Sequence, residues 1–467
     1  MLKIKMAGGG KMDRRTAIKV IGGSVLGIAG LGALATREDI IRWLDADKAA
    51  MESGETKAGK VSTRFYKPLG RELSVLGFGC MRFPMKNGEI DYELTDKMVD
   101  YAYRHGVNYY DTAYFYHGGK SEETIGRILK KYPRESFCLT DKMPTSMIDD
   151  PDDIPEIFEE QLRRCGVEYF DNYLLHSLSS MEKFERIYLA GGGLDYLREQ
   201  KENGRIRSLG FSFHGDVPFF NYLMDNFTWD CTMIQLNYLD WNEANESPNG
   251  SRQAGSLYRK AEEKNVPCFI MEPVKGGNLA ELPKNAMDIL KRREPKKSAA
   301  SWALRYVGTK PLVVTMLSGM STIEQVVDNV STTTEFKPLD DADMRVLNLS
   351  MGKNDNTGMI PCTYCRYCDP CPYGVDIAGV IKTYNLWAER LGLTEGGHGG
   401  IKEKKEFLIR YKNAVEKSAR ADHCTRCLKC MPRCPQSINI PTEMRKVDEF
   451  VQKLEKDIHK KAEGASV

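Results

Sequence analysis

The chain has 467 residues, of which 41% are hydrophobic and 28% charged, enough for one large domain and a smaller one, each with its own core. The formal net charge is +2, with 67 Lys and Arg against 65 Asp and Glu, so no overall basic field indicates nucleic-acid binding. The positive excess lies in residues 1–35, which hold six basic side chains and one acidic one.

Residues 1–35 have the order of an export signal. The basic stretch Asp13–Lys19 precedes the apolar run Val20–Leu34, and Ala33–Ala35 supplies the small residues of a cleavage site. The run is shorter than the ~20 residues of a membrane-spanning helix, and the pair Arg14-Arg15 resembles a twin-arginine signal. We therefore expect export to the periplasm or cell envelope, with membrane contact only through this segment. The alternatives are a disordered basic tail on a cytoplasmic protein and an uncleaved anchor.

Residues 36–60 are polar and are interpreted as a linker, and residues 61–350 alternate short β-rich runs with amphipathic helical patterns. Eight such repeats predict a (β/α)8 TIM barrel. The predicted strands are Leu76–Cys80, Val107–Asp111, Phe137–Lys142, Asn172–His176, Ser208–Ser212, Thr232–Tyr238, Pro267–Met271 and Leu312–Leu317. The predicted helices include Glu93–His105, Ser121–Lys131, Asp153–Cys165, Leu194–Asn203 and Ser256–Lys264. An open doubly wound sheet is the alternative, but Leu76–Gly79 does not continue into its glycine-rich turn.

Polar side chains end three consecutive predicted strands: Asp111, Lys142 and His176. In a barrel these strand ends face one mouth, where catalysis occurs. Tyr116 follows five residues after Asp111 and could give a proton to a carbonyl oxygen. A free tyrosine has a pKa near 10, but a neighbouring ammonium favours the phenolate and makes the proton easier to donate. Asp111 would hold Lys142 in place, and His176 would orient the carbonyl. The alternative is a structural ion pair with His176 capping a strand.

Four separated segments in this region resemble the catalytic segments of aldo-keto reductases. They are Asp111–Tyr116, Ser121-Glu122, Lys142 and Tyr173–His176, and the resemblance covers roughly residues 62–335. It implies reduction of a small carbonyl substrate with NAD(P)H, or the reverse oxidation of an alcohol. The catalytic residues that it implies are Tyr116, Asp111, Lys142 and His176.

The resemblance also implies a nicotinamide site at the ends of the fifth and sixth strands. Ser212 and Gln235 match positions that hold the carboxamide, and Tyr238 matches the residue that stacks on the nicotinamide ring. Phe213 stands where the family often has Asn, so this part of the pattern is incomplete.

Loops after the seventh and eighth strands are where barrels bind phosphates. The residues implied there are Lys275, Gly276, Ser318, Gly319 and Ser321. Gln325 and Asn329, one helical turn apart, match the family's adenine contacts. The segment Leu317–Thr333 has no basic residue for a 2′-phosphate, so NADH suits it at least as well as NADPH.

The chain has 13 cysteines, and their spacing argues against a disulfide framework. Eight crowd into two short C-terminal runs. The other five fall in or beside apolar segments and are interpreted as buried structural thiols; they are Cys80, Cys138, Cys165, Cys231 and Cys268.

Both C-terminal runs have cluster-binding spacing. The second run, ending in Cys434-Pro435, has the spacing of bacterial two-cluster ferredoxins, and the first, ending in Cys371-Pro372, is one residue shorter. In such proteins the fourth cysteine of each run serves the other cluster. The predicted ligands of the first [4Fe–4S] cluster are Cys362, Cys365, Cys368 and Cys434. Those of the second are Cys424, Cys427, Cys430 and Cys371. Zinc, which paired CxxC motifs also bind, is the alternative.

The segment around these runs, residues 351–467, is predicted to be a small, mainly α-helical ferredoxin-like domain with helices at Asp376–Leu391, Ile401–Ala419 and Pro441–Lys460. The whole chain resembles aldo-keto reductases with a fused 4Fe–4S domain. We therefore expect a carbonyl and alcohol oxidoreductase whose clusters relay electrons to or from a redox protein partner. Nicotinamide moves two electrons at once and a cluster moves one, so a flavin is a further candidate cofactor. The alternatives are clusters that only stabilise the fold, and an electron-transfer or binding subunit with an idle barrel.

Overall fold

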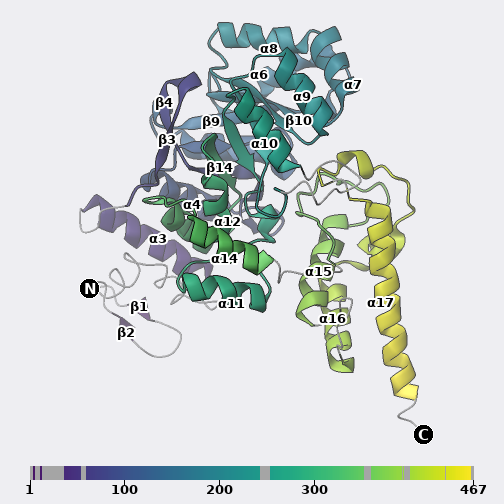
Figure 1. Ribbon diagram of the computed structural model, residues 1–467. Coiled ribbons are helices and arrows are strands. Elements are labelled where there is room, and N and C mark those ends of the chain that lie inside the picture. Colours follow the sequence, from purple (N-terminus) through teal and green to yellow (C-terminus); the bar gives the residue numbers. More distant parts are fainter. Residues whose placement is uncertain are drawn as a thin grey trace. The chain divides into compact units, whose positions relative to one another are not determined.

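The computed structural model (Figure 1) describes residues 4–5, 11–12, 36–53, 59–241, 253–351, 359–391, 393, 400–436 and 438–463. It contains two compact units, one built mainly from residues up to Leu349 and the other mainly from Ser350 onward. Apart from the short pairing of β1 (Ile4–Lys5) with β2 (Lys11–Met12), the predicted export signal lies outside the described residues.

Eight parallel strands of the first unit close into a barrel in the order β10-β11-β12-β13-β14-β5-β8-β9. The strands are β5 (Leu76–Gly79), β8 (Tyr109–Asp111), β9 (Cys138–Met143), β10 (Asn172–Leu178), β11 (Leu209–Phe213), β12 (Cys231–Gln235), β13 (Cys268–Met271) and β14 (Val313–Ser318). All residues of β9 and β14 are buried, as expected for strands covered on both faces. The predicted (β/α)8 barrel and its eight strands are confirmed, and the closed sheet excludes the doubly wound alternative.

Helices lie outside the strands (Figure 1). They are α4 (Tyr92–Arg104), α5 (Lys120–Leu129), α6 (Ile154–Cys165), α7 (Met181–Phe184), α8 (Gly193–Glu202), α9 (Val217–Asn226), α10 (Ala254–Glu263), α11 (Lys284–Arg293), α12 (Ala299–Gly308), α13 (Ile323–Thr333) and α14 (Asp341–Met351). The five predicted helices correspond to α4, α5, α6, α8 and α10. Gly126 lets α5 pack closely on α6, since a Cβ there would lie 2.2 Å from the carbonyl oxygen of Cys165.

A hairpin closes the amino-terminal end of the barrel. Its strands are β3 (Thr63–Tyr66) and β4 (Arg71–Ser74), which pair in antiparallel register. Tyr66 is fully buried, and its hydroxyl lies 2.6 Å from the hydroxyl of Ser208 at the start of β11. Because this end is filled with side chains, the carboxyl ends of the strands are the open end available for chemistry.

The segment predicted to be a linker, residues 36–60, begins with a helix instead. Its first part forms the helix α3 (Arg37–Glu52), which a capping box between Thr36 and Asp39 begins. Trp43 is 7% exposed and its ring lies 5.7 Å from that of Tyr101 on α4. The polar composition concealed the helix, because most of its charged side chains face solvent or pair with α4 while a narrow apolar stripe is buried.

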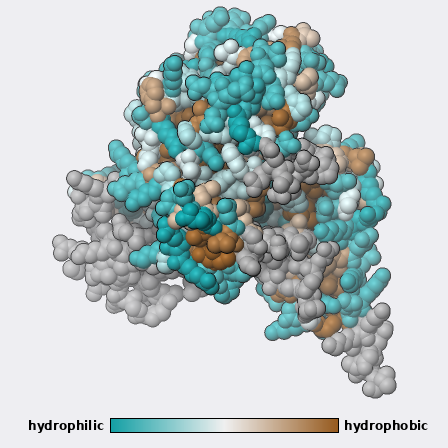
Figure 2. Space-filling view, viewed as in Figure 1, coloured by the Kyte–Doolittle hydropathy of each residue, from teal (hydrophilic) through white to brown (hydrophobic). Residues whose placement is uncertain are grey.

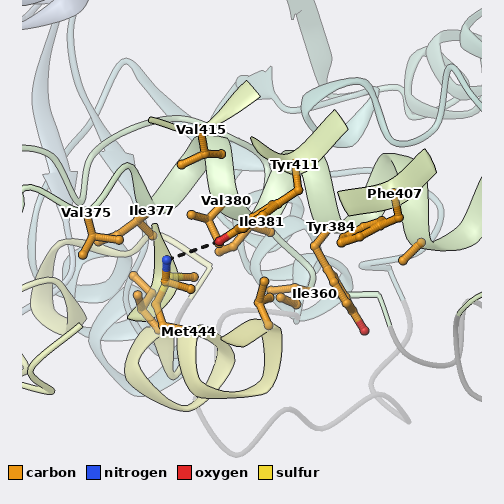
Figure 3. Packing of buried hydrophobic residues seen from close by; sticks show 14 of the residues in the cluster. Ile360, Val375, Ile377, Val380, Ile381, Tyr384, Phe407, Tyr411, Val415 and Met444 are labelled. Carbon is orange, nitrogen blue, oxygen red and sulfur yellow. Dashed lines mark hydrogen bonds between the residues drawn. The ribbon is translucent and has the colours of Figure 1, made fainter. Parts of the chain in front are cut away.

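The second unit packs three helices on one another: α15 (Ile377–Arg390), α16 (Ile401–Ala414) and α17 (Ile440–Glu463). Figure 3 shows their apolar core, in which the Tyr411 hydroxyl accepts a hydrogen bond of 3.3 Å from the amide of Ala421. The predicted helices at Asp376–Leu391 and Pro441–Lys460 agree with α15 and α17. Helix α16 ends five residues before its predicted end, because Val415 is extended. Among the described residues, none of the helices has the length and apolarity needed to cross a membrane.

The five scattered cysteines are buried in the first unit, as predicted. Burial raises the pKa of each of these thiols, to about 12 for Cys231. Protonated thiols of this kind are unreactive, which supports their interpretation as packing residues.

Candidate active site and cysteine loops

Three neighbouring strands and one turn bring the four predicted catalytic residues together at the open end of the barrel. Asp111 ends β8, Lys142 lies near the end of β9, His176 lies in β10, and Tyr116 begins the turn Tyr116–Gly119. The Lys142 ammonium lies 5.1 Å from the centre of the Tyr116 ring, and that centre lies 6.0 Å from the centre of the His176 ring. The strand ends that the sequence marked are therefore adjacent in space.

Lys142 is held by a buried ion pair. Its side chain is 1% exposed, and its Nζ donates to Asp111 Oδ1 and to the Thr112 carbonyl oxygen, both at 2.6 Å. Burial raises the pKa of Asp111, while the charge of Lys142 acts in the opposite direction. Asp111 Oδ2 has no hydrogen-bond partner among the described residues. The pair fixes the ammonium beside Tyr116.

The His176 imidazole favours its neutral form, and the backbone conformation of the next residue sets the orientation of the ring. Its pKa is far below the ordinary value, first because of burial and then because of Lys142 and His214. The next residue, Ser177, has a left-handed φ of 55°, and its amide donates to Ser212 Oγ at 2.6 Å. A non-glycine residue in this conformation is strained by about 1 kcal/mol or more. The Ser212 hydroxyl therefore helps to hold the irregular strand that aims the imidazole.

A polar network that the sequence did not reveal surrounds the Lys142 backbone. The Lys142 amide donates to Asp141 Oδ1 at 2.8 Å, and Gln161 Nε2 donates to the Lys142 carbonyl oxygen at 3.0 Å and to Glu122 Oε1 at 3.1 Å. Arg164 pairs with Glu122 Oε2 at 3.0 Å. Burial, and next the charge of Glu122, raise the pKa of Asp141 well above its usual range. Asp141 therefore holds a proton more readily than a free carboxyl does, and it shares a hydrogen bond with Glu122. The available signal was a second ionisable residue, Asp141, directly before Lys142 in a strand predicted to be buried.

The residues expected at the nicotinamide lie at the carboxyl ends of β11 and β12 or directly after them. Ser212 accepts the Ser177 amide, as described, and Gln235 donates to the buried Asp240 at 2.8 Å. Tyr238 is 2% exposed, and its hydroxyl has no hydrogen-bond partner in the described part of the chain. Lys275 and Gly276 occupy the turn after β13, with left-handed φ values of 47° and 65°.

The residues expected at the adenosine end are engaged within the protein. Asn329 donates to Ser318 Oγ at 2.7 Å, and Gln325 Oε1 accepts the amides of Ser321 at 2.7 Å and Thr322 at 3.3 Å. Gln325 and Thr322 form the capping box of α13. Two amides at this helix start are therefore already satisfied.

Arg82, which the sequence analysis did not single out, lies across the loop after β14. A Cβ on Gly319 would approach the Arg82 Cδ to 2.8 Å, and Ser321 Oγ donates to the Arg82 carbonyl oxygen at 2.8 Å. Since β5 and β14 are paired in the barrel, this guanidinium belongs to the same mouth. The segment Leu317–Thr333 has no basic residue of its own, but its surroundings include one.

The first cysteine group lines a cavity in the second unit, together with Ile377, Ile381, Ile438 and Ile440; the group is Cys362, Cys365, Cys368 and Cys434. The pKa of Cys368 is raised, first by burial, then by Asp369 and by the other three cysteines of the group. The pKa of Cys430 is raised by burial and then by Cys424, Cys427 and Cys371. Each group thus contains one cysteine from the other run, and the role of these residues as cluster ligands stays a prediction.

The two cysteine runs also share one loop conformation. Tyr364 and Arg366 have φ values of 57° and 63°, and the equivalent residues Arg426 and Leu428 have φ values of 61° and 64°. The Tyr364 amide donates to Cys362 Sγ at 3.3 Å. Among the described residues, no three His, Cys, Asp or Glu side chains are close enough to hold one metal ion. The loops thus repeat one backbone conformation, with left-handed residues at equivalent positions.

Comparison with known proteins agrees with this barrel. Residues 75–348 match the Aldo/keto reductase family, and the match ends before the cysteine runs. The chain is 26% identical over 303 residues to the NADH-specific methylglyoxal reductase of Escherichia coli (strain K12), covering 56% of this chain and 92% of that protein. It is 23% identical over 301 residues to the L-galactose dehydrogenase of Arabidopsis thaliana, covering 60% and 90%.

Among solved structures, the holo form of an aldo-keto reductase from Bacillus halodurans has the same fold. Its TM-score is 0.50 at 22% identity, and the match covers 62% of this chain and 96% of that one. The family match spans more than half of the sequence and contains the buried Lys142–Asp111 pair beside Tyr116 and His176. This chain therefore belongs to the aldo/keto reductase family and is an oxidoreductase.

Proposed function

We propose that the barrel interconverts a small carbonyl compound and its alcohol with a nicotinamide cofactor, and that two [4Fe–4S] clusters in the C-terminal unit relay electrons to or from a redox partner. The observation that carries the first part is the position of the Lys142 ammonium. It lies 2.6 Å from Asp111 Oδ1 and 5.1 Å from the centre of the Tyr116 ring, at the open end of the barrel. This is the arrangement that activates a phenol as a proton donor.

The residues act on the carbonyl oxygen. Tyr116 gives its proton to this oxygen as charge develops there, and the Lys142 ammonium favours the phenolate that remains. Asp111 keeps the ammonium in place and balances its charge. The neutral imidazole of His176 can donate a hydrogen bond to the same oxygen and orient the substrate. The nicotinamide, when bound, supplies or accepts the hydride.

The residues proposed to hold the nicotinamide are Ser212, Gln235 and Tyr238. The residues proposed to contact the phosphates and adenine of the cofactor are Lys275, Gly276, Ser318, Gly319, Ser321, Gln325 and Asn329. Because the Arg82 side chain lies against Gly319 in the loop after β14, we assign phosphate neutralisation in this loop to Arg82. The lack of basic residues in Leu317–Thr333 and the NADH specificity of the Escherichia coli relative both favour NADH.

The second part of the proposal rests on the cysteine groups. Zinc sites usually take four ligands from two separated pairs, whereas each run here holds four cysteines and ends in Cys-Pro. A [4Fe–4S] cluster is larger than a single metal ion, and its four thiolate ligands bind one to each iron. Two observations suit a cluster of this size. They are the cavity lined by Cys362, Cys365, Cys368 and Cys434 and the left-handed loop conformation that both cysteine runs share. Each cluster, when bound, supplies one-electron transfer.

Export by the twin-arginine route, through residues 1–35, remains part of this proposal and rests on the sequence alone. A hydride carries two electrons, so coupling it to the clusters requires two successive transfers. A flavin bound through the phosphate loops of the barrel would make that conversion. If the barrel were idle, the chain would be an electron-transfer or binding subunit, and the experiment below separates these cases.

The test is an anaerobic titration of the cluster-loaded protein with NADH and then NADPH, followed by visible absorbance and electron paramagnetic resonance. Bleaching with a reduced-cluster signal is expected, and a bound flavin would appear in the same spectrum. A protein that lacks iron and acid-labile sulfide would contradict the cluster proposal. Loaded clusters that do not respond to either nucleotide would contradict their coupling to the nicotinamide.

A further inference from the structure

We propose that the second cysteine loop is the docking surface for an acidic one-electron carrier protein. The surface, called here the carrier face, is formed by Thr425–Lys429 together with Tyr373. The inference rests on the proposed clusters, because the face surrounds three of the ligands of the second cluster.

The two cysteine loops have the same backbone but different exposure. All thirteen cysteines lie in the described residues, and Cys427 alone among them is exposed. Thr425–Lys429 is exposed throughout, whereas the first group lines a cavity with four isoleucines. An electron from outside would therefore reach the second cluster more readily than the first.

Apolar side chains are exposed next to these ligands. Eight large hydrophobic residues are exposed in the described part of the chain, and two belong to this face: Leu428 at 58% and Tyr373 at 50%. Leu428 follows Cys427, and Tyr373 comes two residues after Cys371. The molecular face shown in Figure 2 is mostly hydrophilic, with smaller hydrophobic patches. A small apolar centre with a polar rim is the usual anatomy of a protein interface.

The rim of the carrier face is basic. From Lys417 to Arg433 the chain has five Lys or Arg and one acid, Asp422. Neither Arg426 nor Lys429 forms an ion pair with any of the described residues. In the first loop the basic residue between Cys362 and Cys368 is Arg366, and it is neutralised by Asp369 at 2.9 Å and by Asp376 at 3.1 Å.

Unpaired cations beside an exposed redox ligand favour a partner with an acidic surface, because complementary charge accelerates and orients the encounter. In each encounter one electron leaves the reduced carrier and enters the second cluster, or passes in the reverse direction. Two encounters supply the two electrons that one hydride contains, so the exchange balances.

The test measures binding rather than turnover. The probe is an acidic plant-type [2Fe–2S] ferredoxin, titrated calorimetrically into the cluster-loaded full-length protein at low and at high salt. The test variants are Lys429→Glu and the double variant Arg426→Glu/Lys429→Glu. The matched control is Lys402→Glu/Lys405→Glu on α16, where both lysines are exposed and also unpaired within the described residues.

We expect the double variant to weaken ferredoxin binding at least about tenfold at low salt, the single variant to weaken it less, and the control to change it less than about twofold. Equal affinities in the test and control variants would overturn the inference, as would a wild-type protein that does not bind the ferredoxin.

Iron content and reduction by dithionite distinguish this failure from failure of the proposed function. A wild-type protein without iron would remove both proposals. A variant with full iron, a normal dithionite-reduced signal and weakened ferredoxin binding would support the carrier face, since the cluster itself is then intact.

Discussion

Asp141 and Glu122, both without exposed surface, share a hydrogen bond beside the backbone of Lys142. Two ionised carboxylates at this separation would repel one another in a medium that screens charge poorly. The raised pKa of Asp141 favours a proton there, which removes that repulsion, and Arg164 balances the remaining charge of Glu122. Asp111 is then the carboxylate that pairs with the Lys142 ammonium, whose other contact is the Thr112 carbonyl oxygen, and this pairing is what the proposed chemistry requires.

This protonation predicts a pH-dependent effect of Asp141→Asn. A carboxyl whose pKa is raised in the folded state contributes stability below its unfolded pKa, and this stability is lost as pH rises through the folded pKa. Asparagine cannot ionise, yet it can accept the Lys142 amide and donate to Glu122. We expect the free energy of unfolding of Asp141→Asn relative to wild type to rise between pH 4 and pH 9, reaching a gain of about 1–3 kcal/mol.

Thermal unfolding followed by circular dichroism at each pH measures this difference. Asp141→Leu is the control, since it removes the hydrogen bonds and should destabilise the protein at every pH. A constant difference between Asp141→Asn and wild type would show that Asp141 does not carry the proton.

Replacement of Lys142 by Met tests the buried ion pair. The variant leaves the Asp111 carboxylate buried without its cation, so we expect a loss of about 3–5 kcal/mol in the free energy of unfolding. The double variant Lys142→Met/Asp111→Asn should recover part of this loss, whereas activity should stay low in both. Denaturant unfolding of the four proteins in a double-mutant cycle gives the coupling. Additive effects of the two substitutions would mean that the contact between Lys142 and Asp111 contributes nothing to the free energy of unfolding.

Tyr116→Phe tests the proton donor. Removal of the hydroxyl should lower kcat by about 10²–10⁴ and leave the affinity for NADH nearly unchanged, because the ring remains. Single-turnover reduction of a small aldehyde, with nucleotide binding measured separately, checks both. Tyr114→Phe is the control: its hydroxyl donates to Glu160 at 2.6 Å, and its loss should not affect the reaction. Equal rates for the two variants would refute the assignment.

Arg82→Ala tests the assigned phosphate contact. We expect the dissociation constant for NADH to rise by about tenfold or more, since a charge-assisted contact to phosphate is lost. Quenching of nicotinamide fluorescence measures it. Lys86→Ala, at an exposed lysine four residues further along the chain, should bind NADH as wild type does. An unchanged constant for Arg82→Ala would place the phosphates elsewhere.

Trp43→Ala tests whether α3 is part of the folded barrel unit. Truncation of this side chain, 7% exposed, should lower the free energy of unfolding by about 3–5 kcal/mol. Arg42→Ala on the same helix removes only a surface ion pair and should change it by less than about 1 kcal/mol. Similar small effects of both variants would mean that α3 unfolds separately from the barrel.

Much of the fold and of the candidate site could be predicted from local sequence patterns. The alternation of strand and helix predicted the barrel, because strands covered on both faces must be apolar runs. The strand-end residues Asp111, Lys142 and His176 were predictable as neighbours, because parallel strands in a barrel all end at one mouth. The spacing of the cysteine runs predicted their grouping through Cys371 and Cys434 for a similar reason: short gaps limit which side chains can meet.

Other features depended on contacts between distant parts of the chain. The hydrogen bond between Ser321 and Arg82 joins residues 239 apart in sequence, and barrel closure alone brings them together. The internal bonds of Gln325 and Asn329, the raised pKa of Asp141 and the packed helix α3 follow from burial and neighbours that composition does not reveal. Sequence periodicity and spacing determined which elements form and where reactive side chains stand along them. Only the tertiary structure decided which polar groups are desolvated and paired, because those energies depend on what lies across the barrel rather than along the chain.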